Sequence, residues 1–116
     1  QIRRPLDVAL MREASAYFIG EKNFASFEAA GSDAMHSMRR VTAISIAEKS
    51  DGLIEIEFKG TAFLRHMVRI MTGTLAAVGR GKLKPTDIPR IIEARDRTAA
   101  ATTAPPEGLF LVRVEY

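Results

Sequence analysis

The chain has 116 residues, of which 47% are hydrophobic and 27% charged, a composition typical of one folded domain. It contains no cysteine, which excludes disulfides, thiolate nucleophiles and cysteine-ligated zinc or iron–sulfur sites. No apolar run approaches the ~20 residues that span a bilayer. We therefore expect a soluble, cytoplasmic protein, and because the chain opens on Gln1 we expect a piece of a longer one.

Positive charge is concentrated in one part of the chain. The stretch between Glu57 and Asp87 holds six lysines and arginines and no acid, so it carries +6, whereas the rest carries 11 basic against 14 acidic residues, or −3. Clustered cations favour a polyanionic partner because binding phosphates releases counterions. A solvated basic surface without a specific partner is the alternative.

The first half of the chain predicts a helix and a hairpin. Residues 6–19 predict a helix, capped by Asp7 and stopped at Gly20, and residues 21–38 an irregular connection. Residues 39–49 and 53–59 alternate with the two-residue period of strands joined by a turn at Asp51 and Gly52. In the first strand this period places Thr42, Ile44 and Ile46 on one face and Val41 on the other.

The second half predicts two helices and a strand. Residues 61–78 predict an amphipathic helix whose polar arc contains Arg65, Arg69, Thr72, Ala76 and Arg80. A further helix begins at Thr86 and Asp87, and a proline-bearing loop leads to a final strand at 109–116. This order predicts an α+β fold over 1–116, a single domain with helices packed on one face of an antiparallel sheet. Three strands leave an unpaired edge, which missing polypeptide or a second subunit would complete.

Few individual residues indicate a metal-binding or catalytic site. His36 and His66 have no partner at metal-ligand spacing, so we expect no metal site, and no carboxylate pair or G-x-S-x-G turn indicates hydrolysis. From residues alone, the sequence favours a basic nucleic-acid-binding module, with a protein-interaction domain as a further alternative. Five residues are candidate RNA contacts: Arg65, His66, Arg80, Lys82 and Lys84.

A family resemblance extends this interpretation. The run Phe63–Leu75, F-L-R-H-M-V-R-I-M-T-G-T-L, resembles the F-x-x-x-M-V-R-x-x-x-G-x-L segment of tRNA pseudouridine synthases of the TruA family. The later segments 96–98, 104–111 and 114–116 resemble that family's closing motifs in the same order. Because these matches fall in the carboxyl-terminal half of the family's catalytic region, the resemblance implies half of a pseudouridine-synthase fold.

The resemblance also implies an activity. Uridine in the anticodon arm of tRNA would be isomerised to pseudouridine by a homodimeric enzyme that needs no cofactor or metal. Arg69 matches the arginine that pairs with the catalytic aspartate, and Leu109 matches the apolar residue beside the target base. The G-R-T-D motif that carries this aspartate is absent from the chain, so we expect the isolated fragment to be inactive. The alternative is a non-catalytic RNA-binding module. The role of Arg69 requires that its guanidinium face a cleft.

Overall fold

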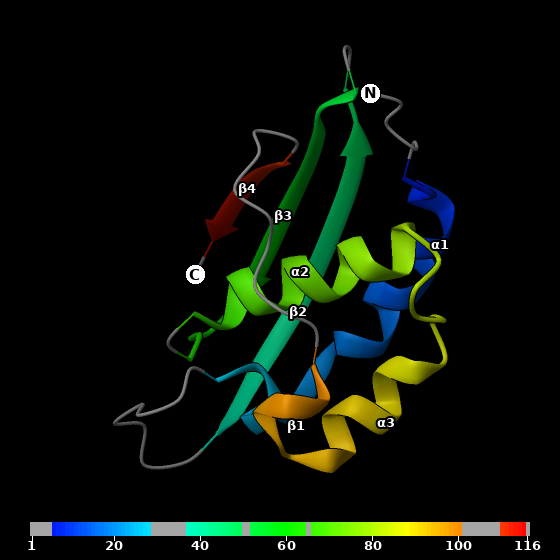
Figure 1. The fold of residues 1–116 in the computed structure, drawn as a ribbon. Coiled ribbons are helices and arrows are strands. Elements are labelled where there is room, and N and C mark those ends of the chain that lie inside the picture. Colours follow the sequence, from blue (N-terminus) through cyan, green and yellow to red (C-terminus); the bar gives the residue numbers. More distant parts are fainter. Residues whose placement is uncertain (1–5, 29–36, 50–51, 65, 101–109, 116) are drawn as a thin grey trace.

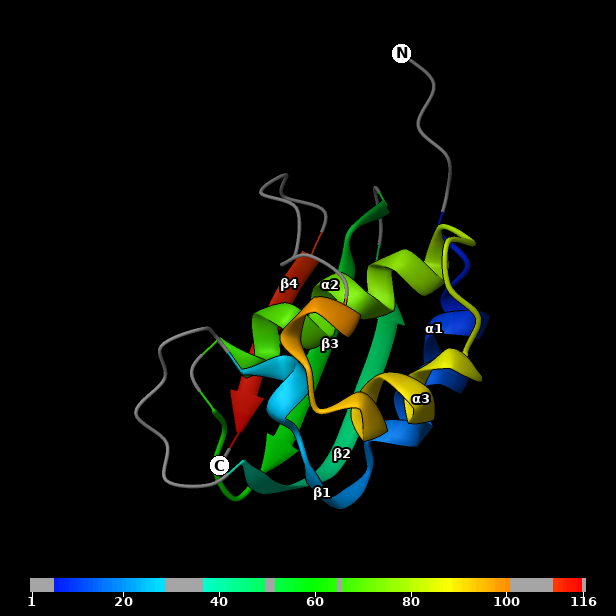
Figure 2. The same cartoon turned by 60° about the horizontal axis from the view of Figure 1, so that its bottom comes forward.

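The computed structural model describes residues 6–28, 37–49, 52–64, 66–100 and 110–115 (Figure 1). Its elements are, in chain order, α1 (Val8–Ser15), η1 (Ala16–Phe18), β1 (Gly20–Asn23), η2 (Ala25–Phe27), β2 (Met38–Glu48), β3 (Ile54–Gly60), α2 (Met67–Gly79), α3 (Asp87–Ala94), η4 (Arg97–Ala99) and β4 (Phe110–Glu115), where η marks a single 3-10 turn. Within these ranges the strands form one sheet in the order β1-β2-β3-β4, and the helices lie on one of its faces (Figures 1 and 2). The α+β prediction is confirmed. No described helix is long and apolar enough to cross a membrane.

The predicted first helix is confirmed and is shorter than expected. The Asp7 carboxylate accepts a 3.1 Å hydrogen bond from the backbone N–H of Leu10, which caps α1. The helix tightens into η1 and gives way to β1 at Gly20, where φ is +118°. Glycine adopts such an angle without a steric penalty, so the chain can reverse there.

The prediction of an irregular connection over residues 21–38 is wrong for the described part of this segment. It contains η2 and the short strand β1, which pairs antiparallel with the start of β2 from Gly20↔Val41 to Asn23↔Met38. The sequence of β1, Gly-Glu-Lys-Asn, has low strand propensity. Its extended conformation depends on pairing with β2, a long-range contact that a local pattern does not reveal.

The predicted hairpin is confirmed by the antiparallel pairing of β2 with β3, whereas residues 50 and 51 of its turn lie outside the described residues. The facing of Val41 was predicted wrongly. A register shift between Val41 and Ala43 inserts one extra residue, and Val41 pairs with Gly60 and is fully buried. This β-bulge reverses the alternation, so Val41 joins Ile46 in the core and Thr42 is exposed.

The sequence predicts an antiparallel sheet, and this prediction is wrong at one edge. There β4 runs parallel to β3, from Ile54↔Phe110 to Lys59↔Glu115. The connection between these strands contains α2 and α3, both on the same face of the sheet (Figure 1). Such a crossover returns the chain to the end of the sheet from which β3 started, and a parallel pair follows.

The core lies between the sheet and α2. Three phenylalanines, Phe18, Phe24 and Phe27, pack with ring centroids 5.1 to 6.5 Å apart and join η1 to η2. Contrary to the predicted polar arc, Thr72 and Ala76 of α2 are fully buried, because α1 and η2 also pack against this helix. The Thr72 hydroxyl donates to the carbonyl oxygen of Val68 at 2.8 Å, which satisfies a polar group inside the core.

Candidate functional site

Arg69 stands apart from the rest of α2. It is the third residue of this 13-residue helix and the only one that is exposed, whereas Val68 and Ala77 are half-buried and the others buried. Among the described residues, no acid forms an ion pair with its guanidinium. The fold therefore presents one permanently charged group from an otherwise buried helix.

The amino-terminal end of α2 beside Arg69 is electropositive. Its first turn contains no acidic residue, and its N-cap residue, His66, makes no side-chain capping bond. The first N–H groups of a helix and its dipole attract negative charge, so a cation here is unfavourable until an anion binds. His66 itself is exposed and has the left-handed backbone angles φ 61° and ψ 9°. This conformation costs about 1 kcal/mol for a residue other than glycine, and such strain concentrates at functional sites.

Three of the predicted RNA contacts lie at the opposite end of α2. Arg80 is the C-cap residue, and Lys82 and Lys84 follow it; all three are exposed. Along the helix axis, at 1.5 Å per residue, Arg80 lies about 17 Å from Arg69 and about 21 Å from His66. The structure thus divides the predicted basic surface into two groups. Cations after a helix carboxyl terminus also interact favourably with its dipole, which gives this group a structural role as well.

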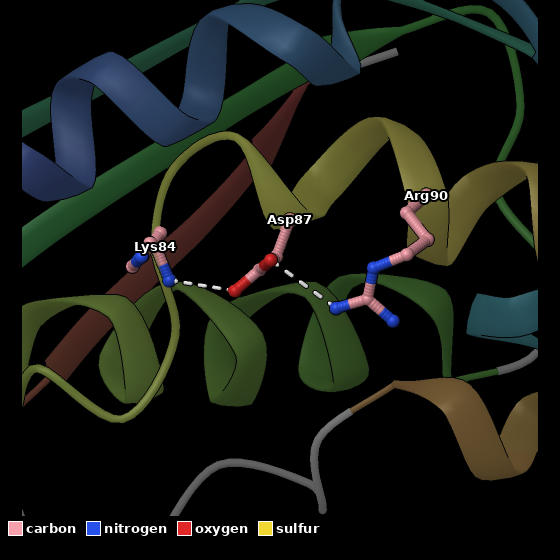
Figure 3. Close-up of polar contacts among 3 residues, drawn as sticks. All are labelled: Lys84, Asp87 and Arg90. Carbon is pink, nitrogen blue, oxygen red and sulfur yellow. Dashed lines mark hydrogen bonds and ion pairs between the residues drawn. The ribbon is translucent and has the colours of Figure 1, made fainter.

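Lys84 precedes the cap of α3. Its backbone N–H donates to Asp87 Oδ2 at 2.8 Å, and Arg90 Nη2 donates to Asp87 Oδ1 at 3.2 Å (Figure 3). The Lys84 amide and then the Arg90 side chain hold the pKa of Asp87 below its ordinary value. Asp87 is the first residue of α3, and its carboxylate is held by the loop before the helix and by Arg90 within the helix.

Two predicted site residues, Arg65 and Leu109, lie outside the described residues, as does His36. In the strand that follows Leu109, the residues Leu111, Arg113 and Glu115 pair with the half-buried side of β3, on the face without helices. Val112 and Val114 align with the buried side of β3, yet each is 38% exposed. Because β4 is the edge strand of the described sheet, the helices do not cover these valines.

Two hollows lined by described residues lie beside β2 and beside α3, and Arg69 lines neither. Neither hollow is the cleft expected around its guanidinium, so that cleft stays a prediction. Across the same residues, no group of three histidine, aspartate or glutamate side chains is arranged to hold a metal ion.

Two polar contacts were not predicted from the sequence. Arg12 Nε donates to the carbonyl oxygen of Ile46 at 2.9 Å, and the buried Ser26 hydroxyl connects η2 to α3 and η4. Each contact joins residues that are 34 to 70 positions apart in the chain. No local pattern marks Arg12 or Ser26, because all three of their partners are backbone groups whose position only the tertiary fold determines.

Cations at both ends of α2, on an α+β sheet covered by helices on one face, are typical of nucleic-acid-binding proteins. A family model described as tRNA pseudouridine synthase matches residues 14–116, and the chain belongs to this family. It is 44% identical over 115 residues to tRNA pseudouridine synthase A of Acetivibrio thermocellus and of Ruminiclostridium cellulolyticum, and 43% identical to that of Geotalea uraniireducens. Each alignment covers 99% of this chain and 47% of the relative, so the chain spans about half the length of these curated relatives.

Proposed function

We propose that this chain contributes Arg69 to the active site of an enzyme that converts uridine to pseudouridine in the anticodon arm of tRNA. In this isomerisation the bond between ribose C1′ and uracil N1 breaks and a bond from C1′ to C5 forms. The proton on C5 is lost to solvent and N1 gains a proton, so atoms and charge balance. The family match over residues 14–116 carries the proposal, and the exposure of Arg69 at a helix end without an acid supports it. The cleft that the role of Arg69 requires would be completed by polypeptide outside this chain.

Arg69 acts in this proposal by holding a carboxylate. A guanidinium stays protonated at all relevant pH values and offers a planar fork of donors, which orients an anion and keeps it ionised. The amino terminus of α2 adds to the attraction. The carboxylate is the catalytic aspartate, which lies on polypeptide outside this chain. Leu109 packs against the uracil without competing for its hydrogen bonds.

The basic residues bind the tRNA backbone. Arg65 and His66 directly precede α2 in the sequence, and Arg80, Lys82 and Lys84 follow its carboxyl terminus. Because phosphate contacts position RNA without reading its sequence, groups separated by the length of α2 engage separate phosphates of one extended substrate. The family is one that acts on tRNA, which supports this assignment.

The exposed edge of β4 joins the remaining polypeptide. Leu111 is 40% exposed and Val112 and Val114 are each 38% exposed, so both faces of this edge strand present apolar side chains. An uncovered edge of this kind is usually paired or covered in a stable protein. We therefore propose that the chain is the carboxyl-terminal half of a longer enzyme and is inactive alone. The family resemblance further implies that this enzyme is cytoplasmic and homodimeric.

Reconstitution tests this proposal. The chain is mixed with the amino-terminal half of the same protein, and release of tritium from tRNA labelled at uridine C5 is measured. Release by the mixture and by neither half alone is the expected result. Release by this chain alone would contradict the assignment of the carboxylate to the other half.

A non-catalytic RNA-binding module is the second candidate, favoured by the six cations and absence of acids between Glu57 and Asp87. It predicts that the reconstituted protein binds tRNA but releases no tritium. The coding sequence upstream of Gln1 provides a further discriminator, because a G-R-T-D motif there supports the enzyme.

A further inference from the structure

A hollow of about 510 Å³ lies at the edge of β2 that faces α1. On this edge β1 pairs with β2 only over Met38–Val41, so no described strand pairs with β2 beyond the bulge. The walls are the carboxyl-terminal end of α1, the η1 turn that follows it, and residues 42–46 of β2. Helix α1 lies alongside this edge, at the opposite side of the sheet from β4 (Figure 1).

The orientation of the β2 backbone follows from one contact. Arg12 Nε donates to the Ile46 carbonyl oxygen at 2.9 Å, so this carbonyl points toward the hollow and away from β3. Backbone groups in a strand alternate in direction, and residues two apart share an edge. The N–H of Ile44 is therefore directed to the same edge and is a donor available to a ligand.

Arg12 supplies the charge of the hollow. Of the nine lining residues it is the only charged one, so no carboxylate in the lining neutralises it. Only its Nε has a partner among the described residues, which leaves the N–H donors of Nη1 and Nη2 available. The bond from Nε fixes the plane of the guanidinium. Ser15, whose hydroxyl donates to the Arg12 carbonyl oxygen at 2.8 Å, tightens the helix turn that carries Arg12.

We propose that this hollow binds a phosphate group. The guanidinium offers two parallel donors that match two oxygens of a phosphate, and the Ile44 N–H adds a third. Thr42 and Ser45, exposed residues in the lining, bring hydroxyl groups that can donate to the remaining oxygens. The phosphate comes either from the RNA backbone or from a small phosphorylated molecule. The site does not depend on Arg69 or on catalysis.

Inorganic phosphate is the first probe. We expect amide resonances of residues 42–46 and the Arg12 Nε resonance of the 116-residue chain to shift saturably during an NMR titration at constant ionic strength. Arg12→Met keeps the length of the side chain and removes the guanidinium, and should weaken binding about tenfold or more. Lys22→Met removes one positive charge outside the hollow and should change the affinity less than about twofold.

Ser45→Asp keeps the test decisive if Arg12→Met fails to fold. The new aspartate carboxylate places a negative charge in the lining and should abolish phosphate binding. Ser45→Asn introduces an uncharged side chain of the same shape as aspartate and should retain phosphate binding. Equal saturable shifts in Arg12→Met and the unsubstituted chain, or unchanged binding in Ser45→Asp, would overturn the proposal, as would the absence of saturable shifts at residues 42–46.

A short single-stranded RNA then distinguishes the two phosphate sources. If the ligand is the RNA backbone, Arg12→Met lowers the slope of log affinity against log salt concentration by about 0.7, the value of one phosphate contact. Lys22→Met is the control in this measurement too. An unchanged slope together with phosphate binding at residues 42–46 assigns the site to a small phosphorylated molecule.

Discussion

The Ser26 hydroxyl accepts a 2.9 Å hydrogen bond from the backbone N–H of Asp96 and donates at 2.6 Å to the carbonyl oxygen of Ile91. Ser26 is fully buried in η2, so one side chain satisfies the end of α3 and the start of η4 at once. The turn from which the chain proceeds toward Leu109 is thereby anchored to the core.

Ser26→Ala should destabilise the fold by about 1–3 kcal/mol, because the substitution leaves a buried carbonyl and a partly buried N–H without their partner. Urea unfolding followed by circular dichroism measures the change in the free energy of unfolding. The matched control is Ser45→Ala at an exposed position, which should change it by less than about 0.5 kcal/mol. A loss for Ser26→Ala no larger than that of the control would show that water replaces these hydrogen bonds.

Arg69→Ala in the full-length enzyme should reduce the rate of pseudouridine formation and leave folding stability nearly unchanged. Loss of a preorganised electrostatic partner costs about 3 kcal/mol in the transition state, whereas an exposed side chain contributes little to the core. Single-turnover kinetics with saturating enzyme measure the rate, and urea unfolding measures stability. Arg90→Ala, which removes a cation paired only on its own helix, is the control. A near-normal rate for Arg69→Ala would exclude the assigned role.

Gly60→Ala should destabilise the protein by about 1–3 kcal/mol or more. A Cβ at this position would lie 2.5 Å from the carbonyl oxygen of Arg40, a backbone atom of the paired strand that cannot move independently. Gly79→Ala is the informative comparison, because its Cβ would lie 2.8 Å from the Sδ of Met11, an atom near the end of a flexible side chain. Alanine also has higher helix propensity, by about 1 kcal/mol, so the second substitution should cost less. Thermal unfolding of both variants should show a larger drop in melting temperature for Gly60→Ala than for Gly79→Ala.

Asp87 should make stability depend on pH in acid. Its pKa is lowered in the folded state by the Lys84 N–H and by Arg90, so the folded protein favours the ionised carboxylate. This contribution is present above the unfolded pKa, near its ordinary value of 3.8, and is lost as the pH falls through the lower folded pKa. Asp87→Asn should therefore flatten the decline of the free energy of unfolding below about pH 4. Arg90→Met should flatten it partly, because the backbone donor remains. An unchanged decline in Asp87→Asn would contradict the role of this carboxylate.

Several elements could be predicted because their cause is local. The core positions of α2 recur at helical spacing, and the hairpin strands alternate at a period of two, so the pattern of burial alone identifies both. Asp7 caps α1 through a contact three residues away, which is within reach of a sequence rule. The likeness to the pseudouridine synthases also rests on short runs of neighbouring residues.

The candidate site was only partly predictable. The charge of Arg69 and the cationic group after α2 are properties of the sequence, but their separation to opposite ends of the helix depends on where α2 begins and ends. The exposure of Arg69 while Thr72 and Ala76 are buried depends on the packing of α1 and η2 around the helix. A helical projection assigns these residues to one polar arc because it contains no neighbouring elements.

The sequence by itself determined the period of each main element, the basic segment and the family to which the chain belongs. The tertiary structure decided the rest: the bulge that buries Val41, the strand β1, the parallel direction of β4 and the contact from Arg12 to Ile46. The physical reason is the separation along the chain over which each kind of interaction acts. Periodicity and capping arise from interactions over a few residues, whereas register, strand direction and side-chain bonds to distant carbonyls are set by segments that meet only when the whole chain folds.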